Sequence, residues 1–230
     1  MRHRIFIDAI QPTVTVTGDE FHHSIRVVRV REGEEVEVFD RAGKMAKAVV
    51  ASIAKDSAVL NVGEEIPSRE STIAIDLAMA IINLDKFELV LQKATELGVR
   101  SIIPLITERV ELRPERYSGK AARWQKIVFE AVKQSGRSRV PAIEEPVELE
   151  ELLKREGTKI LFDADASPAT QQPSNPVTLI IGPEGGWSDH ELEAARTAGC
   201  EFARLGPRRL RAETAAIAAV AILTARLGDL

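Results

Sequence analysis

The sequence predicts an α/β protein in which a small β-rich domain precedes a larger domain of alternating strands and helices. β-Branched runs broken by glycines fill residues 1–65, a pattern typical of short strands. From residue 72 onward, apolar strand-like runs alternate with helical patterns, which is typical of a mostly parallel sheet covered by helices. The polar, proline-containing stretch 66–72 separates the two patterns, so we expect domains at residues 1–70 and 71–230.

The expected N-terminal domain is a small β-barrel or sandwich, because its strand-like runs are short and regularly spaced. These runs lie at residues 14–17, 35–39, 46–53 and 58–62. One helix around residues 20–30 is expected to interrupt them.

The expected C-terminal domain opens with a βαβ unit. Residues 72–81 form an apolar run of buried-strand type, and residues 99–106 form the next strand. The helix between them should be capped by Asp85 and end at Gly98. Further helices are expected at 118–134, 148–156, 188–198 and 212–227, and further strands at 158–165, 177–181 and 201–205.

Composition excludes several classes of protein. The single cysteine, Cys200, excludes an internal disulfide and a cysteine-based zinc site. The longest apolar run, residues 215–223, has less than half of the roughly 20 residues needed to span a bilayer. The first residues also lack the apolar region of a secretory signal. We therefore expect a soluble, cytoplasmic protein with no metal and no membrane partner.

The net charge of −4 conceals an uneven distribution. Residues 109–140 carry nine basic and three acidic side chains, whereas residues 141–203 carry four basic and 13 acidic ones. Four further arginines lie within residues 204–211. A solvated helix face would account for the first basic segment, but arginine's planar fork suits phosphates and base edges, which favours an RNA surface.

The most distinctive motif is the glycine-rich loop 182–186, which follows an expected buried strand and precedes an expected helix. Ser188 and Glu191 have capping-box spacing, and Trp187 with Leu192 has the spacing of a hydrophobic staple. Open α/β sheets bind ligands at such strand ends, although a tight turn alone would also explain the glycines. Neither a P-loop nor a Rossmann fingerprint is present, and Glu184 favours a cationic ligand over a phosphate.

Two other segments carry candidate functional residues. Arg211 precedes an alanine-rich helix, where the helix dipole disfavours a cation, so a functional role is the better explanation. Glu213 lies in the first turn of that helix, where a carboxylate can also serve as an ordinary helix-capping group. Arg137 follows Gly136 at the end of an earlier helix, and an ordinary C-cap explains it equally well.

Four segments together carry a family resemblance: KATELGV (93–99), QSGR (134–137), IGPEGGW (181–187) and LGPRRLRAET (205–214). In this order and spacing they resemble the ribosomal RNA uridine N3-methyltransferases, the RsmE-type branch of the SPOUT superfamily. The stretch 21–40 is also similar to that family's N-terminal region, so the resemblance covers essentially the whole chain.

The resemblance implies a PUA-like β-barrel that helps to hold RNA, and an α/β domain tied in a deep trefoil knot. It further implies that S-adenosylmethionine binds in the knot and that a homodimer completes the site. By motif match, the cofactor contacts would come from Leu161 or its loop, and from Ile181, Gly182, Glu184, Gly185, Gly186, Leu205, Gly206, Leu210 and Arg211.

The implied reaction is direct methyl transfer to N3 of a uridine in small-subunit (16S) ribosomal RNA, free or within the small ribosomal subunit. Arg211, helped by Arg137 from a partner subunit, would stabilise the uracil anion, and Glu213 is the candidate base. Phosphates would be bound by Arg2, Arg4, Arg26, Arg109, Arg113, Arg123 and Arg139. Two alternatives remain: a sibling SPOUT enzyme acting on a ribose 2′-hydroxyl or a transfer RNA base, and a non-catalytic RNA-binding assembly factor.

Overall fold

The computed structural model describes residues 3–110, 117, 119–167 and 175–227. Two compact units make up the chain: residues 1–70 with 132–140, and residues 71–131 with 141–230. The expected domain division at residue 70 assumed continuous segments, and it did not include residues 132–140 in the first unit. The division into residues 1–70 and 71–230 stays a prediction.

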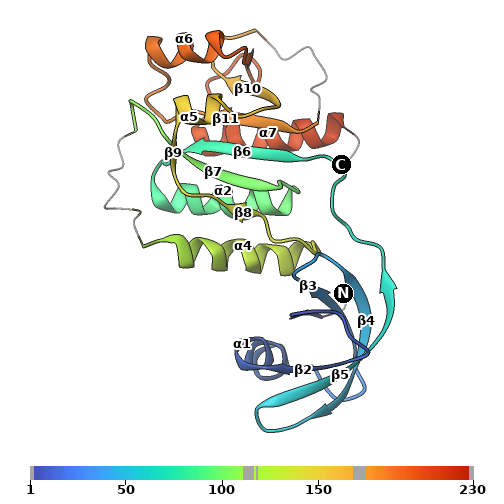
Figure 1. The fold of residues 1–230 in the computed structure, drawn as a ribbon. Helices are drawn as coiled ribbons and strands as arrows, with labels where there is room; N and C mark the ends of the chain where they lie inside the picture. The colour runs from blue at the N-terminus through green and yellow to red at the C-terminus, as the bar shows by residue number, and fades with distance from the viewer. Residues whose placement is uncertain (1–2, 111–116, 118, 168–174, 228–230) are drawn as a thin grey trace. The chain divides into compact units, whose positions relative to one another are not determined.

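The first unit is built on a five-stranded sheet with the strand order β1-β3-β4-β5-β2 (Figure 1). Its strands are β1 (Arg4–Ile7), β2 (Thr13–Thr17), β3 (Glu35–Asp40), β4 (Met45–Ile53) and β5 (Ser57–Ile66). β1 pairs with β3 in parallel, and the other pairs are antiparallel. Two register shifts between β4 and β5 interrupt the ladder, and such irregularities bend a strand and increase its twist.

The core of this sheet follows from residue alternation in the strands. Val36 and Val38 of β3 are fully buried, whereas Glu35 on the same strand is exposed. The expected helix at 20–30 is present as α1 (Gly18–Phe21) continued by the π-helical η1 (His22–Val27). Helical structure stops before residue 30 because Arg29 adopts a left-handed conformation, with φ at 66°.

The second unit contains the expected parallel sheet, in the order β12-β10-β11-β6-β7-β8, with β9 also pairing with β7. Its strands are β6 (Ile75–Ala80), β7 (Ser101–Ile106), β8 (Ala142–Ile143), β9 (Val147–Glu148), β10 (Thr158–Phe162), β11 (Val177–Ile181) and β12 (Glu201–Ala203). All of these pairings are parallel. The carboxyl ends of the strands therefore meet at one edge.

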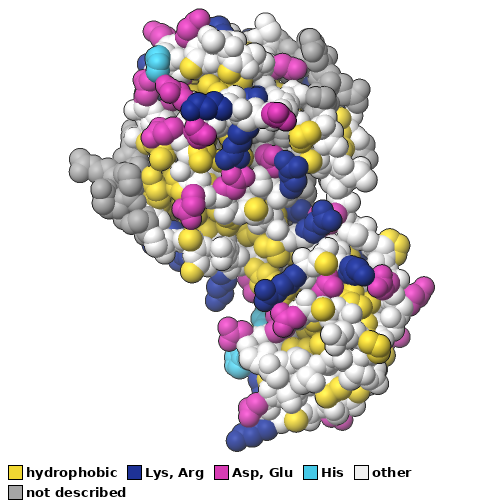
Figure 2. All heavy atoms as spheres, in the orientation of Figure 1, with side chains coloured by type: hydrophobic (Ala, Val, Ile, Leu, Met, Phe, Trp, Pro, Cys, Tyr) yellow, Lys and Arg dark blue, Asp and Glu magenta, His cyan; other side chains and the backbone are white. Residues whose placement is uncertain are grey.

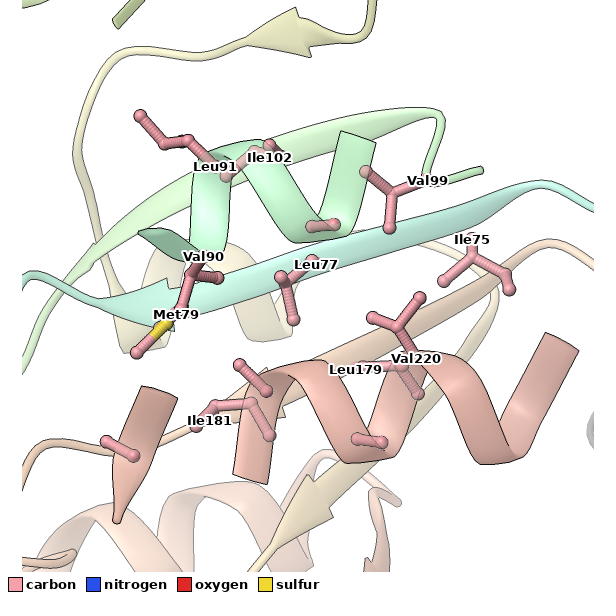
Figure 3. Close-up of a cluster of buried hydrophobic side chains, with 14 of the residues drawn as sticks. Ile75, Leu77, Met79, Val90, Leu91, Val99, Ile102, Leu179, Ile181 and Val220 are labelled. Atoms are coloured by element: carbon pink, nitrogen blue, oxygen red, sulfur yellow. The ribbon is translucent and has the colours of Figure 1, made fainter. Parts of the chain in front are cut away.

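Helices cover both faces of this sheet. The helices are α2 (Leu84–Glu96), α4 (Ala121–Ser135), α5 (Leu149–Leu153), α6 (Asp189–Thr197) and α7 (Ala212–Arg226). Ile75, Leu77 and Met79 of β6 pack in one cluster with side chains of α2, α4 and α7. Ala78 on the opposite face of β6 packs with α5 and α6. Figure 3 shows the first cluster, in which Val90 of α2 and Val220 of α7 both lie near β6.

One expected helix cap was wrong. Asn83, not Asp85, is the N-cap of α2, and its side-chain oxygen accepts a hydrogen bond from the Asp85 backbone N–H at 3.0 Å. The helix begins at Leu84, so Asp85 lies inside the first turn, where its charge favours the positive helix end. Gly98 ends the helix as expected, with a positive φ of 93°. The knot implied by the family resemblance stays a prediction.

Candidate functional site

A cavity of about 710 Å³ lies at the carboxyl ends of the neighbouring strands β12, β10 and β11. Its walls come from three separate segments of the second unit and from Arg109. The lining residues lie within 162–165, 181–192 and 203–215. This position agrees with the general placement of ligands at the carboxyl edge of open parallel sheets.

The loop after β11 forms the first wall and is held in place by Trp187. The Trp187 Nε1–H donates a hydrogen bond to the Phe162 carbonyl at 3.0 Å, which ties this loop to the end of β10. A Cβ added at Gly182 would lie 2.8 Å from Trp187 Cε2, so glycine is required for this packing. Gly186 has a φ of 71°, a conformation that side-chain-bearing residues rarely adopt.

The start of α6 completes this wall through the expected capping box. The Ser188 hydroxyl accepts a hydrogen bond from the Glu191 N–H, and the Glu191 carboxylate accepts one from the Ser188 N–H at 2.8 Å. Trp187 and Leu192 also pack in the same core cluster, as a hydrophobic staple requires. The second Glu191 oxygen accepts from the Glu108 N–H at 3.0 Å, which fixes the loop after β7 against α6.

The segment after β12 forms the opposite wall. The Arg204 backbone N–H donates to the Ser167 carbonyl at 3.0 Å, so the segments following β10 and β12 are joined. The Nε of Arg204 is buried and has no hydrogen-bond partner among the described residues. Arg211 is the N-cap residue of α7, but its side chain makes no capping hydrogen bond, and the residue is exposed at the cavity.

A charged cluster missed by the sequence analysis adjoins this cavity. Lys86 of α2 forms a close ion pair with Glu184 of the glycine-rich loop, and its Nζ lies 3.9 Å from Glu213 Oε1. The other Glu213 oxygen is buried without a hydrogen-bond partner in the described part of the chain. A usable signal was present in the sequence, because a lysine in the first turn of a helix opposes the helix dipole, as Arg211 does.

A second ionic pair lies beside the cavity wall. His190 Nδ1 lies 2.9 Å from a Glu108 carboxylate oxygen. The hydrogen bond that the imidazole donates to Glu108 raises the pKa of His190, and the same bond, with one from Ser188, lowers the pKa of Glu108. Because both side chains are well exposed, this pair contributes little to stability.

Most of the residues expected to bind the cofactor line the cavity. These are Ile181, Gly182, Glu184, Gly185, Gly186, Leu205, Gly206, Leu210 and Arg211. Leu161 is the exception, because its side chain is fully buried in the core between the sheet and helices α5 and α6. The segment just after it, Phe162 to Asp165, lines the cavity instead. Arg109, expected to contact RNA, also lines this cavity and donates to the Gly185 carbonyl at 3.2 Å.

Two of the expected functional arginines have buried, structural partners. The Arg4 side chain is only 7% exposed, and its guanidinium donates to the backbone carbonyls of Val132 and Arg137 at 2.9 and 2.7 Å. The Arg137 guanidinium donates to the Glu70 carboxylate at 2.7 Å within the same unit. The structure therefore does not place Arg4 on the surface as a phosphate contact, and it brings Arg137 to Glu70 and not to the cavity lining.

The other expected RNA contacts differ in their surroundings. Arg26 and Arg139 are exposed in the first unit, and Arg123 is exposed on α4 but pairs with Glu88 of α2. Arg2 and Arg113 lie outside the described residues. On the face drawn in Figure 2, basic and acidic side chains are interspersed and do not form one block of a single sign.

The cavity carries charges of both signs. Acidic side chains come from Asp163, Asp165, Glu184 and Asp189, and basic ones from Arg109, Arg204, Arg208, Arg209 and Arg211. Such a lining suits a ligand that has both a cationic centre and an anionic group.

Among the described residues no group of three or more histidine, cysteine, aspartate or glutamate side chains has an arrangement for a metal ion. The described helices include none whose length and hydropathy match a membrane span.

Comparison with protein families matches both units. The family described as "RNA methyltransferase domain" matches residues 69–224, and "RNA methyltransferase PUA domain" matches residues 16–63. The chain is 32% identical to ribosomal RNA small subunit methyltransferase E of Bacillus subtilis (strain 168), over 93% of this chain and 90% of that protein. It is 33% identical to the protein of the same name from Synechocystis sp. (strain ATCC 27184 / PCC 6803 / Kazusa), over 95% of this chain and 75% of that protein.

A solved structure is similar over nearly the whole chain. This is the ribosomal RNA small subunit methyltransferase E from Neisseria gonorrhoeae bound to S-adenosyl methionine. The TM-score is 0.90 and the sequence identity 33%, with 98% of each chain covered.

Proposed function

The chain belongs to the ribosomal RNA small subunit methyltransferase E family, and from this premise we propose that it methylates N3 of a uridine in 16S ribosomal RNA. It is an S-adenosylmethionine-dependent ribosomal RNA methyltransferase. The choice of uridine N3 as acceptor and the roles of individual residues are the proposal. The observation that carries these roles is an exposed arginine, Arg211, at the cavity end of α7 with no capping bond of its own.

The cavity residues fit S-adenosylmethionine, which has a cationic sulfonium, an ammonium and a carboxylate. A Cβ added at Gly186 or Gly206 would meet nothing within 4 Å, so these two lining residues leave room for a ligand beside the backbone. The Nε–H of Arg204 is buried and has no partner among the described residues, so it is a donor that a carboxylate would satisfy. Glu184 and the neighbouring aspartates suit the cationic groups.

When bound, the cofactor supplies a methyl group on a positively charged sulfur. The chain must orient the uracil in line with that methyl and remove water from the site, which supplies much of the rate. We assign to Arg211 the stabilisation of negative charge on uracil O2 or O4. Glu213 is two residues further on, and one of its oxygens has no hydrogen-bond partner in the described part of the chain, which supports its assignment as the acceptor of the N3 proton.

In this assignment the catalytic arginine is Arg211 alone. Arg137 would have to leave Glu70 before it could act from a partner subunit, and that would leave the half-buried Glu70 carboxylate without its cation. Its contacts support a structural role for Arg137 in holding residues 132–140 against Glu70.

RNA binding is assigned to the first unit together with exposed arginines. The PUA match covers residues 16–63, and Arg26 and Arg139 lie exposed in this unit. Because phosphate contacts release counterions, RNA binding through these residues should weaken as salt rises.

A homodimer is the proposed assembly. α7 is apolar on nearly every side, and Ile222 is 42% exposed although seven of the 15 residues of the helix are buried. Leu89 of the adjacent α2 is also exposed. A second copy would cover these apolar groups. Light scattering should therefore report twice the mass of one chain, and the mass of a single chain would contradict this assembly.

We also propose that the protein is located in the cytoplasm.

Methyl transfer can be tested directly with labelled S-adenosylmethionine. Undermodified small-subunit RNA and small subunits should each be incubated with the protein, and the digested nucleosides identified by mass spectrometry. The proposal expects 3-methyluridine. A 2′-O-methylated nucleoside, or label in transfer RNA only, would indicate a sibling activity, and no incorporation would indicate a non-catalytic RNA-binding factor.

A further inference from the structure

Lys86 joins two carboxylates that come from distant parts of the chain. Its ammonium forms an ion pair with Glu184 in the loop after β11, and its Nζ lies 3.9 Å from Glu213 Oε1 in the first turn of α7. Lys86 itself lies in the first turn of α2, next to the Asn83 cap. One side chain therefore links three segments at the rim of the cofactor cavity.

The location of Lys86 is unfavourable for a lysine unless another interaction compensates. The positive end of the α2 dipole repels its ammonium. Glu213 has the complementary problem, because it is buried and one of its carboxylate oxygens has no hydrogen-bond partner among the described residues. Because Lys86 Nζ lies 3.9 Å from Glu213 Oε1, the two unfavourable positions offset each other.

We propose that Lys86 is a positioning residue of the methyl-transfer site, whose ammonium holds the carboxylates of Glu184 and Glu213 in place beside the cofactor cavity. This inference rests on the proposed function, in which Glu184 contacts the cationic cofactor and Glu213 accepts a proton. Lys86 does not itself line the cavity; it acts through the two carboxylates.

The consequence of removing Lys86 follows from the charges around it. Within three residues of Lys86, Glu184 or Glu213 along the chain, the other charged side chains are Asp85 and Glu88 of α2 and Arg211 at the start of α7. Without Lys86, Glu184 and Glu213 face each other as like charges. One of them must then bind a proton or turn away, and either change removes an ionised carboxylate from the site.

The experiment compares Lys86→Met and Lys86→Arg with a matched control, Lys93→Met. Lys93 is on the same helix and forms an ion pair with Glu96, but it does not line the cavity. Calorimetry should measure the Kd of S-adenosylmethionine and of uncharged-sulfur S-adenosylhomocysteine between pH 5 and 9. Methyl-transfer kinetics should give kcat and KM over the same range, and thermal unfolding should be followed without ligand.

For Lys86→Met we expect S-adenosylmethionine to bind about 10- to 100-fold more weakly, as for the loss of one charge-assisted hydrogen bond. The acid limbs of the binding and kcat profiles should move upward in pH, because removing a neighbouring cation makes a carboxylate easier to protonate. Lys86→Arg should keep most of the affinity for S-adenosylmethionine, and its acid limbs should stay close to those of the unmodified protein. In a Glu213→Gln background, Lys86→Met should no longer move the acid limb of kcat.

Unchanged affinity and pH profiles in Lys86→Met would overturn the inference. A lowered unfolding temperature matched by Lys93→Met, with no displacement of the acid limb, would also overturn it by indicating a merely structural lysine. If Lys86→Met does not fold, the pH profiles of kcat for Lys86→Arg and Glu213→Gln replace its profile. An acid limb in Glu213→Gln that is identical to that of the unmodified protein would then overturn the inference. Failure of the unmodified protein to bind S-adenosylmethionine would overturn the proposed function as well.

Discussion

The indole of Trp187 packs directly against the backbone of Gly182, leaving no room for a side chain at that position. A Cβ on residue 182 would lie 2.8 Å from Trp187 Cε2 and 3.0 Å from Cζ2, closer than such contacts occur. Because Trp187 also donates a hydrogen bond to the Phe162 carbonyl, the indole cannot move away without breaking the link between two cavity walls. The shape of the cavity thus depends on residue 182 being a glycine, which has no Cβ.

Gly182→Ala should therefore weaken cofactor binding. Displacement of Trp187 is expected to cost about 1–3 kcal/mol of stability through overpacking, and to raise the Kd of S-adenosylmethionine about tenfold or more. Calorimetry and urea unfolding measure the two effects. Gly63→Ala is the control, because its Cβ would make an ordinary 3.6 Å contact with the Lys47 carbonyl. Equal cofactor affinity in the two variants would contradict the role assigned to this contact.

Arg211→Ala should reduce kcat far more than it reduces folding stability. Its side chain makes no capping bond to α7, whereas a donor to a developing anion is worth about 10²- to 10³-fold in rate. Single-turnover methyl transfer separates this effect from cofactor binding. Arg209→Ala removes the same charge from a cavity residue that is 82% exposed, and it should have a much smaller effect. A normal rate in Arg211→Ala would exclude its catalytic role.

Glu191→Ala should loosen the wall between β7 and α6. Its carboxylate accepts hydrogen bonds from the Ser188 and Glu108 N–H groups, so the substitution leaves both donors unsatisfied. We expect a loss of about 2–4 kcal/mol in unfolding free energy, since each unsatisfied group costs about 1–3 kcal/mol. Ser188→Ala removes only the cap and should cost about 1 kcal/mol. Chemical denaturation of the two variants tests this order, and the reverse order would refute it.

Glu70 should make the first unit sensitive to acid. Burial by itself raises the pKa of Glu70, but hydrogen bonds from Arg137 and from the Arg139 and Ser138 N–H groups outweigh it and lower the pKa below its usual 4.5. A carboxyl whose folded pKa is lowered stabilises the folded state above its unfolded pKa, and this stabilisation disappears as the pH falls through the folded value. The contribution of Glu70 should therefore be complete at pH 7 and lost progressively below about pH 4.5.

Glu70→Gln tests this prediction. At pH 7 the variant should be less stable than the unmodified protein by about 1–3 kcal/mol, and the difference should shrink on acidification. Glu64→Gln is the control, because Glu64 pairs with Lys47 on the surface and should cost little at any pH. A Glu70→Gln stability difference that is independent of pH would contradict the assignment.

Binding of RNA should depend steeply on salt, with the exposed arginines of the first unit contributing. Replacing Arg26 or Arg139 by Gln should reduce the slope of log K against log salt by about one each. Filter binding between 50 and 300 mM salt would measure this slope, with Lys47→Gln as the control. Unchanged slopes in the Arg26 and Arg139 variants would exclude these two arginines from the RNA surface.

Arg4→Gln should instead lower stability, because the Arg4 guanidinium is bound to backbone carbonyls.

Much of the fold could be predicted from local patterns. Apolar runs and helical periodicity identified the parallel sheet and the covering helices, because the continuous apolar runs of β6 and β11 reflect burial on both faces. The capping box at Ser188 and Glu191 was also predictable, since it needs only residues three apart. The glycine-rich loop and the arginines after β12 identified the cavity, because both follow strands that end at the same sheet edge.

Other relationships depended on residues far apart in the chain. The sequence showed that Arg4, Arg109 and Arg137 are charged, but not which groups their guanidinium groups contact. Arg4 and Arg137 are buried with backbone carbonyls and Glu70, and Arg109 lies at the cofactor cavity. Lys86 was missed because its two partners, Glu184 and Glu213, are about a hundred residues away or more. Local chemistry therefore determined the elements and the class of ligand, whereas the tertiary structure decided which charges meet, because side-chain pairing depends on distance in space and not on separation along the chain.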